Sequence, residues 1–271
     1  MLDVNRGIKG FFPKGAACWT LDGTPSGLVD QYGNGNNLTP RASALPYPII
    51  DIISGNSGYY FDNTNNRSLT VADSVSLRPA SMTIGIWYKH NAGNNKALLV
   101  KMRNGTTGAS FSLTISVASE FNFILFDAAS RIANSSITPI QGRIYFIAGI
   151  ADVATNKIRI FVFSNGQLLS IGEAAWASGT ITYNTGIVII GSFTSGGFSP
   201  DGIIGPALIL PYAETPSRLM DYYKYETEPV RKYWFIASRI KELDSLSVTS
   251  IKTKNNLAIT SINKINGTEW I

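Results

Sequence analysis

The feature that most constrains the fold is the alternation of apolar and polar residues along most of the chain. Successive side chains of a β-strand point to opposite faces, so this period of two indicates strands with one buried face. Gly, Asn and Ser interrupt the alternation about every ten residues, which is typical of an antiparallel β-sandwich. We expect strands at 82–89, 97–102, 111–117, 121–126, 143–151, 157–164, 167–171, 185–191 and 203–210.

The residues between these segments support antiparallel hairpins. The pairs Asn94-Asn95, Asn104-Gly105 and Asn165-Gly166 favour the positive φ that a tight hairpin turn requires. Asn165-Gly166 lies between two apolar runs and is the clearest of the three. The runs 144–150 and 187–190 are almost continuously apolar, so they should be central strands buried on both faces.

Composition limits the chemistry that the chain can perform. Only 15% of its 271 residues are charged and 44% are apolar, which is enough to build a sizeable core and rules out wholesale disorder. A single cysteine, Cys18, excludes an intramolecular disulfide or a cysteine-based zinc cluster, and we expect it to be a small buried residue. A single histidine, His90, excludes a multi-histidine metal site, and we expect it in an exposed loop.

Charge and hydropathy also limit the partners. The net charge of +5 is scattered, without a basic run or a glycine-rich phosphate loop, so nucleic-acid binding is not expected. The first residues lack the apolar run of a signal peptide, and no segment has the roughly 18 apolar residues of a membrane span. We therefore expect synthesis in a cytoplasm and no membrane insertion; a route out of the cell that needs no signal peptide, such as assembly into a virus particle, stays open.

Helical patterns appear only after the predicted strands. Thr215 and Pro216 begin a short helix that reaches Tyr225, and an amphipathic helix follows from about residue 228 to 243. Two similar strands, 246–251 and 257–262, repeat at a spacing of eleven. The expected parts are an N-terminal segment (1–14), a sandwich (15–226), a helical stalk (227–244) and a β tail for anchoring or oligomerisation (245–271).

The late aromatic residues leave two alternatives open. Tyr222, Tyr223 and Tyr225, with Trp234 and Phe235, either pack back on the sandwich or form an oligomer interface. Apolar residues of the second helix nearly follow a heptad, which is compatible with an oligomer interface. The expected oligomer or anchoring residues are Tyr233, Trp234, Ile236, Ile240, Leu243 and Trp270.

Several motifs resemble one fold family. The segments 17–23, 27–39, 58–62, 68–73, 81–89 and 201–210 occur in the order seen in the laminin-G-like branch of the concanavalin A-like jelly rolls. The resemblance covers about residues 17–225 and implies an all-β jelly-roll sandwich, followed here by a short helix and the β tail. The fold serves lectins, adhesins, enzyme appendages and virion proteins alike.

The same resemblance makes calcium a candidate ligand, because many laminin-G-like domains bind calcium at the sandwich rim. The matching candidates are Asp22, Asp30, Asn36 and Asp201, but Gly205-Pro206 stands where the family often has an acidic pair. The alternative is that Asp22, Asp30 and Asn36 shape turns. We therefore predict no cofactor and leave calcium open.

Candidate ligand contacts are aromatic residues near loops, since sugar sites combine aromatic platforms with polar groups. These are Trp176, Tyr183, Phe193 and Phe198, with Asp201; the alternative for Trp176 is that it covers a sheet edge. Glucanases of this fold alternate two carboxylates along one strand. No predicted strand here does so, so we expect no catalytic residue and no enzymatic activity.

The chain end, residues 262–270, resembles bacteriophage virion proteins, which often close with an apolar strand, Asn-Gly and a Trp. The resemblance implies a tail, fibre or capsid-decoration protein. We therefore expect a non-enzymatic virion component that oligomerises, contacts other virion proteins and decorates the particle or adheres to cell-surface glycans. The alternatives are a stand-alone carbohydrate-binding module and a polysaccharide-degrading enzyme.

Overall fold

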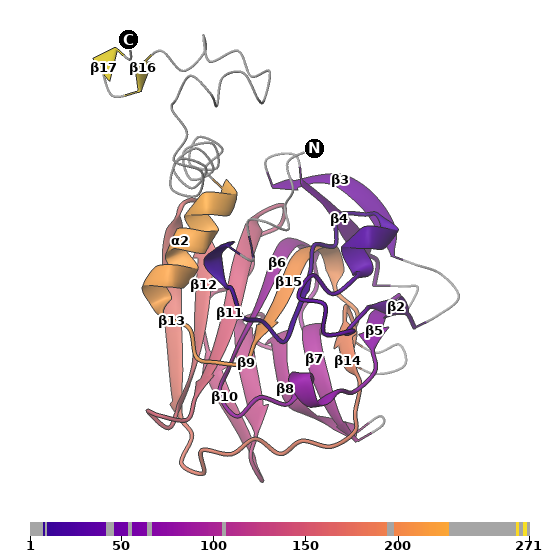
Figure 1. Ribbon diagram of the computed structural model, residues 1–271, viewed down its shortest axis with the longest axis vertical. Coiled ribbons are helices and arrows are strands. Elements are labelled where there is room, and N and C mark those ends of the chain that lie inside the picture. The colour runs from indigo at the N-terminus through magenta and orange to yellow at the C-terminus, as the bar shows by residue number, and fades with distance from the viewer. Residues whose placement is uncertain are drawn as a thin grey trace. The chain divides into compact units, whose positions relative to one another are not determined.

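The computed structural model describes residues 8, 10–41, 46–53, 56–63, 67–104, 107–193, 198–227, 264–265 and 268–269. The chain divides into two compact units, 1–227 and 228–271. The first unit contains two antiparallel sheets that face each other (Figure 1). Its short 3₁₀ helices are η1 (Pro25–Leu28) and η2 (Val75–Leu77), and its α-helix is α2 (Pro216–Thr227).

Sheet A has eight strands among the described residues. In spatial order they are β13 (Gln167–Ala175), β12 (Lys157–Ser164), β11 (Ile144–Asp152), β6 (Met82–Ala92), β15 (Asp201–Leu210), β4 (Asn56–Phe61) and β3 (Tyr47–Ile53), with β1 (Ala17–Trp19) also pairing with β15. Sheet B is formed by β10 (Ser130–Asn134), β9 (Phe121–Phe126), β8 (Thr107–Ile115), β7 (Lys96–Asn104), β14 (Val188–Ile190), β5 (Leu69–Val71) and β2 (Thr39–Pro40). The predicted jelly-roll sandwich is confirmed.

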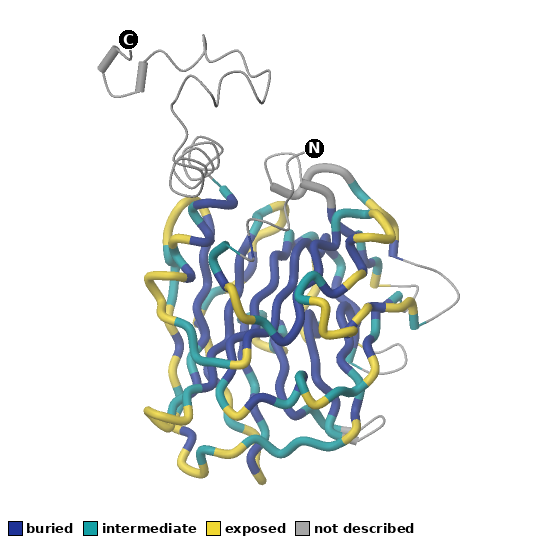
Figure 2. The backbone as a smooth tube through the Cα atoms, in the orientation of Figure 1, coloured by how far each residue is buried: buried dark blue, intermediate teal, exposed yellow. Residues whose placement is uncertain are grey.

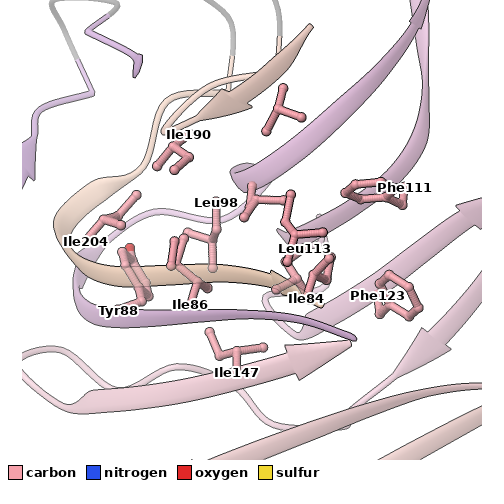
Figure 3. Packing of buried hydrophobic residues seen from close by; sticks show 14 of the residues in the cluster. Ile84, Ile86, Tyr88, Leu98, Phe111, Leu113, Phe123, Ile147, Ile190 and Ile204 are labelled. Atoms are coloured by element: carbon pink, nitrogen blue, oxygen red, sulfur yellow. The ribbon is translucent and has the colours of Figure 1, made fainter. Parts of the chain in front are cut away.

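The main core lies between the sheets. Ile84 on β6 and Ile147 on β11 belong to sheet A, and they share one buried cluster with Leu113 and Phe123 of sheet B (Figure 3). Every second residue of these strands contributes to the cluster, as the alternation in the sequence predicts. Exposed residues concentrate in the connecting loops (Figure 2).

A second buried cluster covers the outer face of sheet A. Trp87 of β6 and Phe146 of β11 point away from the main core and pack against Tyr222 and Tyr223 of α2. Phe12 contacts the same helix through Tyr222, with ring centroids 5.3 Å apart. The run 144–150 is therefore buried on both faces, as predicted. Of the two alternatives for the tyrosines of α2, packing on the sandwich is the one observed.

Strand register defines two opposite ends of sheet A. At one end Met82 pairs with Ala151, and Lys157 pairs with Ala175, so Trp176 follows directly. At the other end Ala92 pairs with Asp201. We call these the Trp176 end and the Asp201 end. The same two ends apply to sheet B, because the hairpin between β6 and β7 places Lys96, the first residue of β7, at the Asp201 end.

Local chemistry explains where the strands turn and where prediction differs. Asn165 and Gly166 have φ of 51° and 78°, which confirms the predicted hairpin between β12 and β13. Pro206 lies inside β15, where the pairing with β6 shifts register between Ile204 and Ala207, because proline cannot donate to a ladder. Six strands of the sandwich were not predicted, namely β1, β2, β3, β4, β5 and β10.

In the second unit, β16 (Lys264–Ile265) pairs antiparallel with β17 (Thr268–Glu269). The predicted helix at 228–243 and the strands at 246–251 and 257–262 lie outside the described residues. The same is true of the predicted oligomer residues Tyr233, Trp234, Ile236, Ile240, Leu243 and Trp270. None of the described helices is both long and apolar enough to cross a bilayer.

Candidate binding site at the Asp201 end

Asp201 is the centre of a polar cluster where β15 begins. The hydroxyl of Tyr60, on the neighbouring strand β4, donates to Asp201 Oδ1 at 3.0 Å. Burial raises the pKa of Tyr60, and the hydrogen bond to Asp201 raises it further, so its hydroxyl stays protonated and available as a donor. Asp201 as a whole is only half-buried.

A second hydrogen-bonded pair supports the cluster from inside the sandwich. The Tyr88 hydroxyl lies 3.1 Å from Asp201 O and 3.1 Å from His90 Nδ1. Because a carbonyl oxygen can only accept, the hydroxyl donates to Asp201 O and accepts from the Nδ1–H of His90. Burial lowers the pKa of His90, and the nearby Asp201 carboxylate partly opposes this shift.

The described structure corrects the expectation for His90. The alternation of β6 continues to Ala92, so His90 is a strand residue with 7% of its surface exposed and not an exposed loop residue. Tyr88 and His90 are two residues apart and so lie on the same face. That spacing is visible in the sequence and would have identified the pair.

Lys96 adds a cation to this end. Its ammonium, at the start of β7, donates to Oδ1 of Asn63, two residues after the end of β4. Burial lowers the pKa of Lys96, while the Asp201 carboxylate favours its charged form. A carboxylate, an ammonium, a phenol and an amide therefore lie together on one rim, although they come from distant parts of the chain.

An aromatic pair borders the cluster. The rings of Phe193 and Phe198 meet edge to face, with centroids 6.1 Å apart. The carbonyl of Phe198 accepts from Ala97 N at 2.8 Å, which fixes it beside the start of β7. Phe198 is 44% exposed and has φ of +66°, a conformation that is unfavourable for a bulky residue. An exposed ring held in a strained conformation is typical of a functional position.

The predicted ligand residues divide between the two ends of the sandwich. Phe193, Phe198 and Asp201 lie together at the Asp201 end, whereas Trp176 and Tyr183 lie at the other. The structure corrects the prediction for Trp176, which is completely buried and donates its indole N–H to Thr180 O at 3.3 Å. Tyr183 packs against Phe111 and donates to Pro79 O at 2.8 Å, so it too has a structural role.

The residues considered for calcium are used in local turns. Asp30 accepts from the backbone N–H groups of Cys18, Tyr32 and Asn34 at 3.0–3.2 Å. Asp22 accepts from Thr24 N at 3.0 Å, and Asn36 donates to Ala16 O at 2.7 Å. In the described part of the chain no three acidic, histidine or cysteine side chains gather as a metal site would require. Cys18 is buried, as expected.

The sequence matches no protein-family model, and no curated protein matches it. Solved structures do resemble the fold. Domain 4 of AbnA, a GH43 extracellular arabinanase from Geobacillus stearothermophilus, was solved in complex with arabinotriose. It matches 77% of this chain and 98% of its own length, with a TM-score of 0.61 and 12% identity.

Two toxin domains are also similar in fold. The binding domain of Paraclostridial Mosquitocidal Protein 1 has a TM-score of 0.58 and 12% identity, over 79% of this chain and 53% of its own. The binding domain of botulinum neurotoxin serotype G has a TM-score of 0.54 and 14% identity, over 77% and 50%. The chain thus spans about half the length of these toxin domains, and the likeness establishes the lectin-like β-sandwich fold alone.

Proposed function

We propose that this chain is a non-enzymatic glycan-binding protein and that its sandwich binds saccharides at the Asp201 end. The observation that carries the proposal is the exposed, strained ring of Phe198 beside the Tyr60–Asp201 pair. A pyranose presents both C–H faces, which pack on aromatic rings, and hydroxyls, which bind carboxylates and amides. The arabinotriose complex of the similar arabinanase domain supports the same ligand class.

A glycan array probed with the full chain tests this proposal. Asp201→Asn should weaken binding at least about tenfold, because a charge-assisted hydrogen bond is lost. Phe198→Ala should weaken it about fivefold through loss of ring contact. Ile171→Ala is the matched control, since Ile171 is 55% exposed on the edge strand β13. Binding that neither site variant reduces, or an array without any signal, would contradict the proposal.

The absence of catalysis is tested separately. Glycans bound on the array are incubated with the protein, and released reducing ends are measured. We expect none above the buffer control. Release of reducing ends that Asp201→Asn abolishes would replace the binding proposal with a polysaccharide-degrading enzyme.

We further propose that the protein is displayed in several copies on a bacteriophage virion, as a tail, fibre or decoration component. Its support is the resemblance of residues 262–270 to phage virion endings and the near-heptad of the stretch 228–243. Multiple copies turn weak glycan sites into strong adhesion. The alternative is a stand-alone carbohydrate-binding module.

Light scattering on the full chain separates the two roles. A virion component should be an oligomer, with a trimer favoured, and the double variant Ile236→Asp/Ile240→Asp should convert it to a monomer. A glycan-binding monomer would favour the stand-alone module. Mass spectrometry of purified phage particles should then detect the chain.

A further inference from the structure

A depression of about 420 Å³ lies beside the outer cluster of sheet A. Its walls come from the turn before β11, the turn between β12 and β13, and the last turn of α2. The lining residues are Trp87, Gly142, Arg143, Ile144, Asn165, Gly166, Tyr223 and Thr227. The polar cluster around Asp201 is built from other residues, so this depression is a distinct feature of the same end of the sandwich.

The walls of this depression are fixed by hydrogen bonds and ring stacking. Trp87 and Tyr223 stack at 5.4 Å with an interplanar angle of 18°. Gly166 N donates to the Tyr223 hydroxyl at 3.0 Å, and Thr227 Oγ1 donates to Tyr223 O at 2.9 Å. A ligand would therefore meet a preformed surface and would not bear the cost of ordering it.

The charged side chains at the depression are basic. Arg143 is half-buried, and among the described residues its side chain has no hydrogen bond or ion pair. Four described arginines, Arg78, Arg131, Arg159 and Arg218, are paired with carboxylates, whereas Arg103 lies over the ring of Phe126. None of the described lining residues is acidic. Lys89 pairs across the strands with Ile144, so its side chain emerges on the same face and adds positive charge.

We infer that this depression, the Arg143 pocket, binds the carboxylate of an acidic saccharide. A planar guanidinium without an internal partner matches a carboxylate in two parallel hydrogen bonds. The side chain of Asn165 is exposed in the lining turn and can bind hydroxyls of the same sugar. The word saccharide rests on the proposed glycan-binding function, whereas the anionic group rests on the pocket alone.

Titration of the full chain with sialyllactose and with trigalacturonic acid tests the inference. The first ligand carries the carboxylate of a sialic acid, and the second carries those of a uronic acid. Lactose and the methyl ester of trigalacturonic acid are the neutral counterparts. At least one acid should bind at least about tenfold more tightly than its neutral form. Its addition should shift the NMR signals of the backbone N–H groups of Asn165 and Gly166, which line the pocket.

Variants locate the binding. Arg143→Gln should weaken acid binding at least about tenfold, and Arg143→Lys should retain part of it, since the charge remains while the two-pronged geometry is lost. Lys14→Gln is the charge-matched control, because Lys14 is exposed near β1 at the other end of the sheet. A thermal melt shows that each variant is folded.

The outcomes separate this inference from the proposed function. Acid binding that Arg143→Gln leaves unchanged, or equal binding of acid and neutral forms, overturns the Arg143 pocket while array binding that depends on Asp201 stands. If binding of the acid requires Arg143, but binding on the array is unchanged by Asp201→Asn and Phe198→Ala, the Asp201 site is overturned instead. The absence of binding by any saccharide overturns both.

Discussion

The two ends of the sandwich use the same residue types in opposite ways. At the Trp176 end, the rings of Trp176 and Tyr183 are inside the fold and their polar atoms bind backbone carbonyls. Charges there neutralise one another, since Lys101 is fully buried and pairs with Asp73, which also binds Arg78. At the Asp201 end, a ring is exposed and Arg143 has no carboxylate partner among the described residues. The groups at the Trp176 end stabilise the fold, whereas the Asp201 end has an exposed ring and an arginine that a ligand can contact.

The sharpest test of this difference is to remove a ring from the stabilising end. Trp176→Ala should lower the free energy of unfolding by about 3–5 kcal/mol, because removal of a completely buried side chain leaves a cavity. Urea unfolding followed by circular dichroism measures the change. Trp176→Phe should cost less, since most of the volume remains.

Glycan binding of the folded fraction of Trp176→Ala should equal that of the unchanged protein. A variant that keeps its stability but loses glycan binding would reverse the assignment of the two ends. It would then restore Trp176 as a ligand contact.

The buried charge cluster gives the next largest effect. Lys101→Met should cost about 2–3 kcal/mol, less than the roughly 3–5 kcal/mol of a buried pair that loses its sole partner, because Arg78 still binds Asp73. Lys101 also donates to Gly186 O, which links β7 to the start of β14. Chemical unfolding at pH 7 measures the loss, and a variant as stable as the original protein would show that the cluster does not stabilise this end.

The same cluster predicts a response to acid. Burial alone would raise the pKa of Asp73, but its hydrogen bonds to Arg78 and Lys101 outweigh burial and lower the pKa below 3.8. The folded state therefore releases this proton more readily than the unfolded chain, and the resulting stability is present above about pH 4 and lost as pH falls. Asp73→Asn should flatten this part of the pH–stability curve. An unchanged slope would assign the acid sensitivity to other carboxylates.

Sequence patterns predicted the stabilising parts of the molecule better than the binding parts. The strands β9 and β12 were predicted at their observed bounds, since each is an apolar run that ends at a turn residue, Asp127 or Asn165. By contrast, β4 contains Asn, Ser and Gly, and its pairing with β15 depends on contacts distant in sequence.

The candidate site was predicted only in part for a similar reason. Phe193, Phe198 and Asp201 were found because they share one loop region. Tyr60 and Lys96 were missed because they reach Asp201 only when β4 pairs with β15 in sheet A and the facing sheet B brings the start of β7 to the same end. Trp176 was included wrongly, because loop proximity in sequence does not reveal that a ring turns inward.

A smaller effect is expected from His90, which lies on the interior side of the binding end. Its lowered pKa means that the unfolded state takes up a proton more readily, so stability is complete above about pH 6.5 and falls as pH decreases below it. His90→Gln removes this titration and can still donate to Tyr88. Unfolding at pH 5 and pH 7.5 should show a smaller difference for the variant. Equal differences would mean that burial of His90 does not couple folding to pH.

The smallest change in stability should come from the ring on which glycan binding depends. Phe198 has φ of +66°, which costs a bulky residue about 1 kcal/mol and costs glycine almost nothing. Phe198→Gly relieves this strain but loses the contact with Phe193, so stability should stay within about 0.5 kcal/mol. Phe198→Ala keeps the strain and should be slightly less stable than Phe198→Gly. Both should bind glycans more weakly, which thermal melts and array titrations measure side by side. If Phe198→Gly were destabilised as strongly as Trp176→Ala, the ring would belong to the core, and the exposed strain at this end would no longer favour a ligand.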